Sequence, residues 1–298
     1  MARKRKGNPV HGWLVVDKPL GVTSAAVVNK ARWALRAEKA GHSGTLDPDA
    51  TGCLAIAFGE ATKVIPVAQE GLKIYHFTVR WGEATSTDDA SGEVIATSPN
   101  RPSRDQIEAA LGGFTGEIQQ VPPKVSAVKI DGQRAYDVMR SGGDVALAAR
   151  TLWVERLALT ASSDLNHAEF ELVCGKGGYV RSIARDLGAT LGCFGHVREL
   201  RRLATGPFDL SQTVPFDAFD SYRSAGEVPA LLPLERGLSE LPVLPILPKN
   251  VEDLRHGRAI GVTMPDTERV WASEGGKAIA IGEIRDGLFR PARVILAH

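Results

Sequence analysis

Residues 41–52 read Gly41-His42-Ser43-Gly44-Thr45-Leu46-Asp47-Pro48-Asp49-Ala50-Thr51-Gly52 and form the densest cluster of glycine and polar residues in the chain. A residue that precedes proline is pushed out of the helical region, so Asp47 is expected on extended backbone that can direct its carboxylate into a cleft. The same residues could instead form an Asx turn or a helix cap ahead of Ala50, since most Asp-Pro pairs lie in turns. The stretch therefore predicts a structured loop with one candidate reactive group, Asp47.

The sequence on either side of this loop predicts interleaved strands and helices. Strands are expected over 13–17, 54–58, 73–81, 125–130, 151–160 and 168–174, and helices over 25–36, 103–114 and 180–191. Thr23 or Ser24 can cap the first helix, and Ser103 the second. Because no regular βαβ repeat is visible, the expected class is α+β with a mixed, mostly antiparallel sheet.

The composition is that of a globular chain with its own core. Of 298 residues, 43% are hydrophobic and 24% are charged, which excludes a fully disordered chain. The longest apolar runs, such as Cys53 to Phe58, are far shorter than the roughly 18 residues of a membrane-spanning helix. No apolar segment follows the basic residues 3–6, so a secretory signal is not expected. The three cysteines form no CxxC pair, which predicts reduced thiols in a cytoplasm rather than disulfides or a zinc site.

Charge is distributed unevenly although the net charge is only +1. Residues 1–40 hold nine Lys or Arg and two Asp or Glu, which gives +7, and residues 176–202 hold six and two, which gives +4. Residues 41–120 carry five basic and eleven acidic side chains, which gives −6. Two basic segments are typical of a nucleic-acid-binding protein, although a solvated tail and an ordinary charged helix would give the same counts.

A cluster of prolines marks a candidate boundary near the C-terminus. Pro229, Pro233, Pro242, Pro245 and Pro248 predict a semi-rigid connector. We therefore expect two domains, 1–240 and 241–298, of which the second is small and rich in strands. Residues 203–298 hold ten basic and thirteen acidic residues, so charge alone does not predict that this end of the chain binds RNA.

Several common catalytic signatures are absent from the sequence. His42 and Asp47 lack the paired His or Cys partners of a metal site. Asp47 and Asp49 could form a pair of carboxylates, but Pro48 between them disfavours the regular strand that would place both on one side. Neither GxSxG nor a Walker A motif occurs, so acyl transfer and phosphoryl transfer lack their signatures.

Further short motifs occur in order on both sides of the loop. They are Asp17-Lys18-Pro19-x-Gly21-x-Thr23-Ser24, Lys73-x-Tyr75, Gly82-x-x-Thr85-x-Thr87-x-Asp89-x-x-Gly92, Pro122-Pro123-x-x-Ser126-Ala127-x-Lys129, Gly132-x-Arg134-Ala135-Tyr136, Gly177-x-Tyr179-x-Arg181-x-x-x-x-Asp186-Leu187-Gly188, Leu200-Arg201-Arg202 and Gly206-Pro207-Phe208. Together with the loop, this set resembles the bacterial tRNA pseudouridine(55) synthases of the TruB type over residues 12–210. Val125 departs from the family, which usually has an aromatic residue there; the difference bears on local packing and not on the chemistry.

The resemblance implies a catalytic domain of the pseudouridine-synthase type and an isomerase. A uridine in the T-loop of tRNA, at position 55, would be detached from its ribose, rotated and rejoined through carbon. The reaction involves no redox change, so no cofactor and no metal are expected. By resemblance, Asp47 is the nucleophile, Arg181 is the cation that keeps it ionised, and Tyr75 stacks on the flipped base, with a hydroxyl that can also carry a proton.

The same resemblance implies further RNA contacts. It assigns substrate binding to His42, which inserts where the base was, to Tyr179 and Leu200, which line the pocket, and to Lys18 and Arg202. It places an RNA-clamping insertion at about residues 124–150, whose basic, glycine-punctuated sequence predicts a segment ordered only when RNA is bound; an ordinary charged helix and loop is the alternative. Residues 241–298 resemble a reduced PUA-type RNA-binding barrel.

Two other functions fit parts of this pattern. One is a non-catalytic RNA chaperone on the same scaffold, which the combination of Asp47, Tyr75 and Arg181 disfavours, because a pure binder needs no buried carboxylate near phosphate. The other is a sister synthase that acts on ribosomal RNA with accessory proteins, for which the chain lacks the long basic tail and docking extensions. We therefore expect a cytoplasmic monomer that acts on tRNA, without an obligate protein partner and without membrane attachment.

Overall fold

The chain divides into two compact units. The computed structural model describes residues 7–125, 129–130, 133–134, 147–225, 229 and 231–296. Met1–Pro48, Gly52–Gly71 and Thr205–His298 make up the first unit, and Asp49–Thr51 with Leu72–Ala204 make up the second. The second unit is thus almost entirely one continuous segment, whereas the first is built from both ends of the chain.

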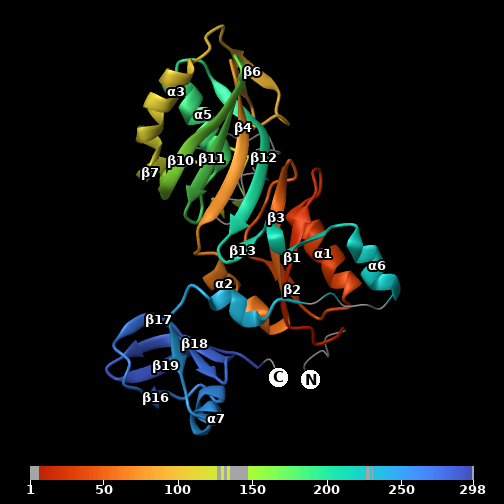
Figure 1. Ribbon diagram of the computed structural model, residues 1–298, viewed down its shortest axis with the longest axis vertical. Helices are drawn as coiled ribbons and strands as arrows, with labels where there is room; N and C mark the ends of the chain where they lie inside the picture. Colours follow the sequence, from red (N-terminus) through yellow and green to blue (C-terminus); the bar gives the residue numbers. More distant parts are fainter. Residues whose placement is uncertain are drawn as a thin grey trace. The chain divides into compact units, whose positions relative to one another are not determined.

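Five strands of the second unit follow one another in the order β12-β4-β11-β10-β7 (Figure 1). They are β4 (Lys73–Trp81), β7 (Gly116–Gln120), β10 (Arg150–Asp164), β11 (His167–Cys174) and β12 (Gly195–Thr205). β4 pairs with β11, β11 with β10, and β10 with β7, each time antiparallel. A separate antiparallel hairpin joins β5 (Glu83–Thr85) and β6 (Val94–Thr97).

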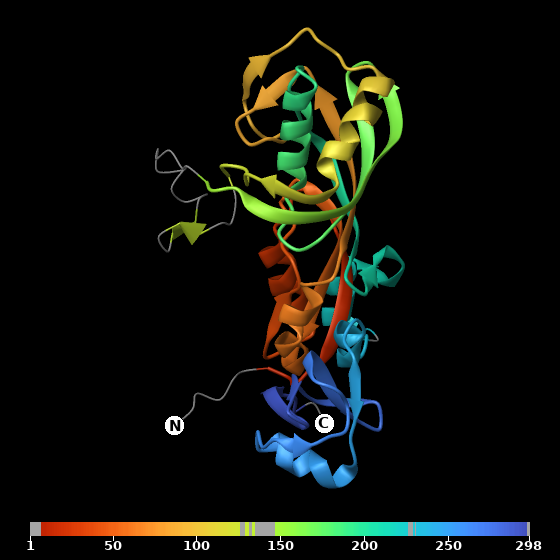
Figure 2. The same cartoon turned by 90° about the vertical axis from the view of Figure 1, so that its left-hand side faces the viewer.

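The core of the second unit follows from the alternation along β4. Alternate residues from Lys73 to Trp81 are buried, and the residues between them are half-buried. Phe77 of this buried face stacks on Phe170 of β11, with ring centroids 5.4 Å apart. Helix α3 (Arg104–Leu111) packs against β10 and α5 (Val180–Thr190) against β4, and the two helices lie beside each other (Figure 1 and Figure 2). One apolar face of the sheet is thereby covered.

Local sequence signals decide where helices begin. Ser103 caps α3 and forms a capping box with Gln106, and Thr23 caps α1 (Ser24–Ala34), so both predicted caps are confirmed.

Helix α5 packs closely on β12: at Gly188 of α5, an added Cβ would lie 2.3 Å from the backbone nitrogen of Gly195 in β12. Only glycine permits this approach of helix to strand.

The first unit contains a mixed sheet in the order β14-β1-β3, with β2 paired to β3. Its strands are β1 (Gly12–Lys18), β2 (Ala40–His42), β3 (Ala50–Phe58) and β14 (Thr213–Pro215), and a two-residue strand, β13 (Phe208–Asp209), precedes β14. β1 is antiparallel to β3 and parallel to β14. Helices α2 (Ile65–Ala68) and α6 (Ala218–Ala225) complete this part, and α1 packs against α6 and β2.

A second sheet of the first unit lies at the C-terminal end, in the order β15-β17-β18-β19-β16. Its elements are β15 (Val243–Pro245), α7 (Val251–Arg255), β16 (Ile260–Gly261), β17 (Thr267–Glu274), β18 (Lys277–Arg285) and β19 (Leu288–Val294). Among the residues described, no pairing of β15 with β16 closes the sheet, so it is open where a barrel was predicted. Trp271 and Ile281 share one core with Trp13, whose indole N–H donates to the carbonyl of Leu234 at 3.1 Å.

Short 3₁₀ helices join these elements at Gly59–Lys63, Gly112–Phe114, Leu210–Gln212, Leu234–Leu238 and Pro248–Asn250. Within the predicted insertion at 124–150, β8 (Lys129–Ile130) pairs antiparallel with β9 (Gln133–Arg134). Most of the predicted RNA clamp, and residues 126–128 of the predicted strand, lie outside the described residues. The clamp therefore stays a prediction.

Candidate active site

The predicted site residues come from both units. Lys18, His42 and Asp47 belong to the first, and Tyr75, Tyr179, Arg181, Leu200 and Arg202 belong to the second.

Asp47 lies between two residues whose backbones are fixed by hydrogen bonds. On one side, the Ser24 hydroxyl accepts a hydrogen bond from the N–H of Leu46 and donates one to its carbonyl, both at 2.8 Å, and Ser24 is only 2% exposed. On the other side, the N–H of Gly21 donates to the carbonyl of Pro48 at 2.8 Å. Asp47 itself is half-buried. The loop therefore fixes the backbone around Asp47 and leaves this residue partly exposed.

Lys18, at the end of β1, is fully buried and directed at the same loop. Its ammonium donates to the carbonyls of Val22 at 2.7 Å, Pro19 at 2.9 Å and Pro48 at 3.2 Å. An ammonium has three N–H donors, so it can bind several carbonyls at once. Lys18 thereby ties the turn after β1 to the residue that follows Asp47.

The turn after Asp47 excludes one of the alternatives for this stretch. Pro48 and Asp49 form the turn and Ala50 begins β3, so a helix cap at this position is excluded. β3 also begins four residues before the strand predicted from Leu54. His42 is the last residue of β2, half-buried and opposite Ile56 of β3. It leads directly into the loop that carries Asp47.

Tyr75 lies on the buried face of β4. It is 8% exposed and stands opposite Leu172 of β11 in the sheet register. Lys73 and Phe77 are its buried neighbours along the same face of the strand. The ring is thus part of an apolar surface that also contains one cation.

Arg181 is a buried guanidinium held by the turn that follows β5. It is 6% exposed, and its Nη1 donates to the carbonyl of Thr87 at 3.1 Å and lies 3.4 Å from Oδ2 of Asp89. Oδ1 of Asp89 in turn accepts hydrogen bonds from the hydroxyls of Thr87 and Ser91 and from the N–H of Ser91. A buried charge is stable where an opposite charge and hydrogen bonds compensate it, so Asp89 both stabilises and orients Arg181.

A second arginine of α5 contacts the neighbouring carboxylate of the same turn. Arg185 Nη1 lies 3.0 Å from Oδ2 of Asp88, and its Nε lies 2.8 Å from Oδ1 of Asp186. Burial raises the pKa of the Asp88 carboxyl, and Arg185 opposes that rise. The consecutive residues Asp88 and Asp89 therefore each bind one arginine of α5.

Tyr179 immediately precedes α5, and its backbone is bound by a residue that the sequence did not single out. The N–H of Tyr179 donates to Oε1 of Gln120 at 2.9 Å, and Nε2 of Gln120 donates to the Tyr179 carbonyl at 3.1 Å. Gln120 is the last residue of β7 and is 3% exposed. No local signal marks it, because its partner lies 59 residues further along the chain.

Leu200 and Arg202 lie on β12. Leu200 is half-buried, and its carbonyl accepts a hydrogen bond from the Thr51 hydroxyl at 3.4 Å. Nη1 of Arg201 also lies 3.4 Å from this hydroxyl, and Arg202 is 2% exposed. Thr51, at the end of the loop 41–52, therefore contacts β12 within the second unit.

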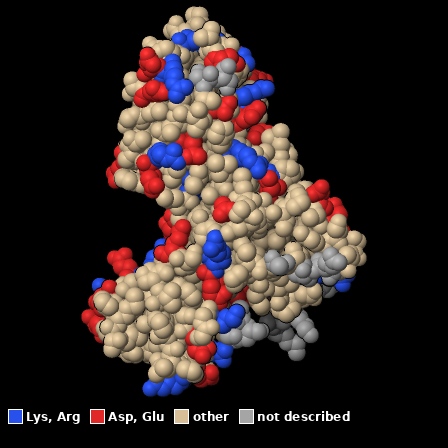
Figure 3. All heavy atoms as spheres, in the orientation of Figure 1, with Lys and Arg blue, Asp and Glu red and all other residues tan. Residues whose placement is uncertain are grey.

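Burial removes part of the basic charge that the sequence places in residues 176–202. Arg181 and Arg202 are buried and Arg185 is paired, whereas Lys176 and Arg198 are exposed. On the face shown in Figure 3, Lys and Arg lie among Asp and Glu. The formal +4 of this segment thus overstates the charge that it presents to a polyanion.

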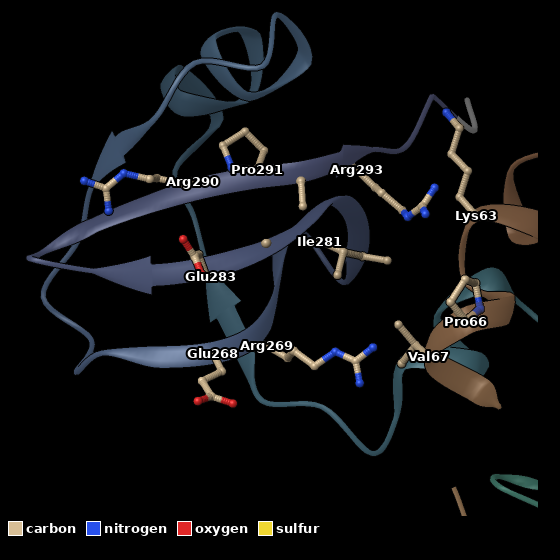
Figure 4. A pocket seen from close by; sticks show the side chains of 12 residues that line it. Lys63, Pro66, Val67, Glu268, Arg269, Ile281, Glu283, Arg290, Pro291 and Arg293 are labelled. Atoms are coloured by element: carbon tan, nitrogen blue, oxygen red, sulfur yellow. The ribbon is translucent and has the colours of Figure 1, made fainter. Parts of the chain in front are cut away.

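A groove of about 460 Å³ lies on the C-terminal sheet, next to α2 (Figure 4). The exposed Arg269 of β17 and Arg293 of β19 point toward Lys63 and Val67, and Ile281 of β18 lies between the two strands. A smaller cavity of about 250 Å³ is lined by residues that include His11 and Lys39. Neither cavity is lined by a predicted catalytic residue.

Neither a metal-binding cluster nor a membrane-spanning helix occurs in the described part of the chain. There, no group of three or more His, Cys, Asp or Glu could hold a metal ion. The cysteines Cys53, Cys174 and Cys193 are buried free thiols. No helix in the ranges given above is long and apolar enough to cross a membrane.

Two family models match the chain. The TruB family pseudouridylate synthase N-terminal domain matches residues 32–180, and the tRNA pseudouridylate synthase B C-terminal domain matches residues 181–239. The tRNA pseudouridine synthase B of Ruegeria sp. (strain TM1040) is 57% identical over 298 residues, which cover 99% of each protein. That of Rhizobium meliloti (strain 1021) is 46% identical and covers 98% of this chain and 97% of the relative.

Solved structures share the fold. A chain of an H/ACA RNP bound to a substrate RNA containing 2'-deoxyuridine superposes with a TM-score of 0.74 at 21% identity, covering 100% of this chain and 92% of that one. A chain of the archaeal box H/ACA sRNP Nop10-Cbf5 complex gives 0.72 at 23% identity, covering 99% and 91%.

Proposed function

The chain belongs to the TruB family of pseudouridylate synthases, and from this membership we infer that it isomerises uridine to pseudouridine in tRNA. We propose that its target is uridine 55 in the T-loop. The observation that carries the assignment is 57% identity to a tRNA pseudouridine synthase B over 99% of both proteins.

The reaction exchanges one glycosidic bond for another. The bond from C1' of the ribose to N1 of the base breaks, the base rotates, a bond from C1' to C5 forms, the proton on C5 is released, and N1 takes up a proton. The atoms of the nucleotide are conserved apart from the position of this proton, and no electrons are gained or lost. The reaction therefore requires a nucleophile, a group that keeps the nucleophile ionised, and a site that holds the detached base.

Asp47 is the proposed nucleophile, which attacks the sugar or the base. The hydrogen bonds of Ser24 to Leu46 and of Lys18 to Pro48 support this role, because they fix the backbone on both sides of the carboxylate. Lys18, expected to take part in substrate binding, is fully buried. Its proposed contribution is therefore indirect, through the shape of the loop that carries Asp47.

Arg181 is the proposed cation that keeps Asp47 ionised and oriented, because a guanidinium stays charged and binds carboxylates in a fixed geometry. Its contacts with Thr87 and Asp89 supply a rigid support for that role. Tyr75 is proposed to stack on the flipped base. One such contact returns about 1–3 kcal/mol against the few kcal/mol that flipping costs.

Four further residues are proposed to shape the substrate site. His42 would fill the place that the flipped base leaves, and Tyr179 and Leu200 would line the pocket. Arg202 is 2% exposed, so we propose that it supports the pocket from within β12.

We also propose the domain organisation and the RNA contacts outside the site. Residues 1–240 would be the catalytic domain, with an RNA-clamping insertion at about 124–150, and residues 241–298 a PUA-like RNA-binding domain on an open sheet. The groove of Figure 4 supports the second part, because four basic residues and two acidic ones line it: Lys63, Arg269, Arg290, Arg293, Glu268 and Glu283. The proposed protein is a cytoplasmic monomer without an obligate protein partner.

The test is to incubate the protein with unmodified tRNA and to map pseudouridine. Asp47→Asn should abolish turnover while tRNA still binds, because the amide keeps the size of the side chain and loses the nucleophile. Turnover of this variant within about tenfold of the parent enzyme would contradict the role of Asp47. Conversion only in ribosomal RNA, or binding of tRNA without conversion by the parent, would favour the sister synthase or the RNA chaperone.

A further inference from the structure

We propose that Gln120 is a positioning residue of the isomerisation, acting through the backbone of Tyr179 on the helix turn that presents Arg181. The inference rests on the proposed function, in which Arg181 and Tyr179 serve the site. It concerns a buried residue whose side chain binds the backbone of Tyr179.

The start of α5 lacks the usual side-chain cap. Tyr179 is its N-cap residue, with φ −109° and ψ 108°, and no side chain of the helix caps it. Ser, Thr, Asp or Asn normally supplies the capping oxygen at this position. Gln120 of β7 binds both backbone groups of this N-cap residue, at 2.9 and 3.1 Å. A carboxamide can do this because it has an acceptor and a donor side by side.

Val121, the residue that follows β7, extends the same attachment. The carbonyl of Val121 accepts hydrogen bonds from Oγ of Ser182 and from Nη2 of Arg185, both at 2.8 Å. Arg181 lies between Tyr179 and Ser182, so its backbone is fixed on both sides. Its long side chain amplifies any rotation of this turn, which would move the guanidinium away from Thr87 and Asp89.

The point of attachment belongs to the sheet and is buried. Gln120 stands opposite Arg150, in the terminal pair of the β7–β10 ladder. Gln120 is 3% exposed, so water does not replace its hydrogen bonds to Tyr179. The sheet therefore fixes the position of Gln120, and Gln120 fixes the origin of the helix that carries Arg181.

Gln120→Ala should lower the single-turnover rate on tRNA about tenfold to a hundredfold, because a misplacement of about 1 Å has effects of that order. The dissociation constant for tRNA should change less than about threefold, because the contact is not with RNA. Gln119→Ala is the matched control. Gln119 is the exposed neighbour on the same strand and binds the Thr151 hydroxyl, so its removal should leave the rate within about twofold.

Gln120→Glu separates positioning from folding. An ionised carboxylate can accept from the Tyr179 N–H but cannot donate to the Tyr179 carbonyl, whereas the protonated acid can do both. Burial raises the pKa of a carboxyl, so the ratio of variant to parent rate should rise as the pH falls from about 8 to about 6. Dividing the variant rate by the parent rate at each pH cancels the titration of all groups that the two proteins have in common.

The outcomes are distinguishable from those of the proposed function. A folded Gln120→Ala protein with the parent rate overturns the positioning role, and so does a rate ratio for Gln120→Glu that is flat with pH. If Gln120→Ala does not fold, the pH series decides. Failure of the parent to convert tRNA, or an active Asp47→Asn variant, would instead contradict the proposed function itself.

Discussion

The hydroxyl of Ser24 offers a sharp test of how the loop serves Asp47. Ser24→Ala removes one oxygen atom and leaves the buried N–H and carbonyl of Leu46 without their partner, each of which it binds at 2.8 Å. One such hydrogen bond contributes about 0.5–1.5 kcal/mol net, so the loss of two lowers the free energy of unfolding by about 1–3 kcal/mol. At roughly 2–4 °C per kcal/mol for a large domain, a central loss of about 2 kcal/mol lowers Tm by about 4–8 °C.

The neighbouring Thr23 supplies the control. Its hydroxyl caps α1 by accepting a hydrogen bond from the N–H of Ala26 at 3.1 Å, whereas the hydroxyl of Ser24 binds Leu46. Thr23→Ala should lower the free energy of unfolding by about 1 kcal/mol, the usual cost of losing a helix cap. The two variants differ by one position in sequence and destabilise the same unit.

Their activities should differ much more than their stabilities. Ser24→Ala frees the residue before Asp47, so its single-turnover rate should fall about tenfold or more, whereas Thr23→Ala should stay within about twofold of the parent. The rate is measured as release of tritium from C5 of labelled uridine in tRNA, well below both Tm values. Equal rates for the two variants, or rates that follow only the folded fraction, would refute the reasoning.

Three further predictions concern other parts of the molecule. Tyr75→Phe should keep tRNA affinity and lose rate if the hydroxyl carries a proton, whereas Tyr75→Ala should weaken binding by about 1–3 kcal/mol; equal rates for Phe and parent would leave stacking alone. Affinity for tRNA should fall steeply with salt, and Arg269→Ala/Arg293→Ala should reduce the slope of log K against log salt by about 1–2, unlike Lys277→Ala/Arg285→Ala; a flat plot for the parent would contradict this. Burial raises the pKa of the Cys174 thiol to about 12, so at neutral pH iodoacetamide should label it only after unfolding, and rapid labelling of the native protein would count against it.

Those features that depend on a few consecutive residues could be predicted from the sequence. Thr23 and Ser103 cap the helices that follow them, because a hydroxyl ahead of a helical pattern satisfies the first N–H groups whatever the tertiary structure. The alternation from Lys73 to Trp81 predicted β4 with its exact bounds, since one face of the strand is buried throughout. The early start of β3 was missed because Gly52 is a weak strand former, which enters the strand by pairing with Lys18 of β1.

The supports of the candidate site could not be read in the same way. Asp89 belongs to a motif that the sequence shows. Its ion pair with Arg181 could not be predicted, because it joins the turn after β5 to α5, far apart in the chain. Lys18 looked like an RNA-binding cation, and only its burial against three carbonyls shows that it organises the loop. Gln120 carries no local pattern at all. Contacts between distant segments depend on tertiary packing, which short-range propensity does not encode.

The assembly of the first unit from both ends of the chain has a consequence for its synthesis. Trp13 is fully buried, and the carbonyl that its indole binds belongs to Leu234, 221 residues later. At roughly 5–20 residues per second, the ribosome delivers that partner about 10–45 s after Trp13. Residues 72–204 have been synthesised by then and can fold first, while the apolar face of β1 is still exposed to solvent. The nascent chain should therefore be a chaperone client during this interval, and codons that slow translation between residues 72 and 204 should prolong that dependence.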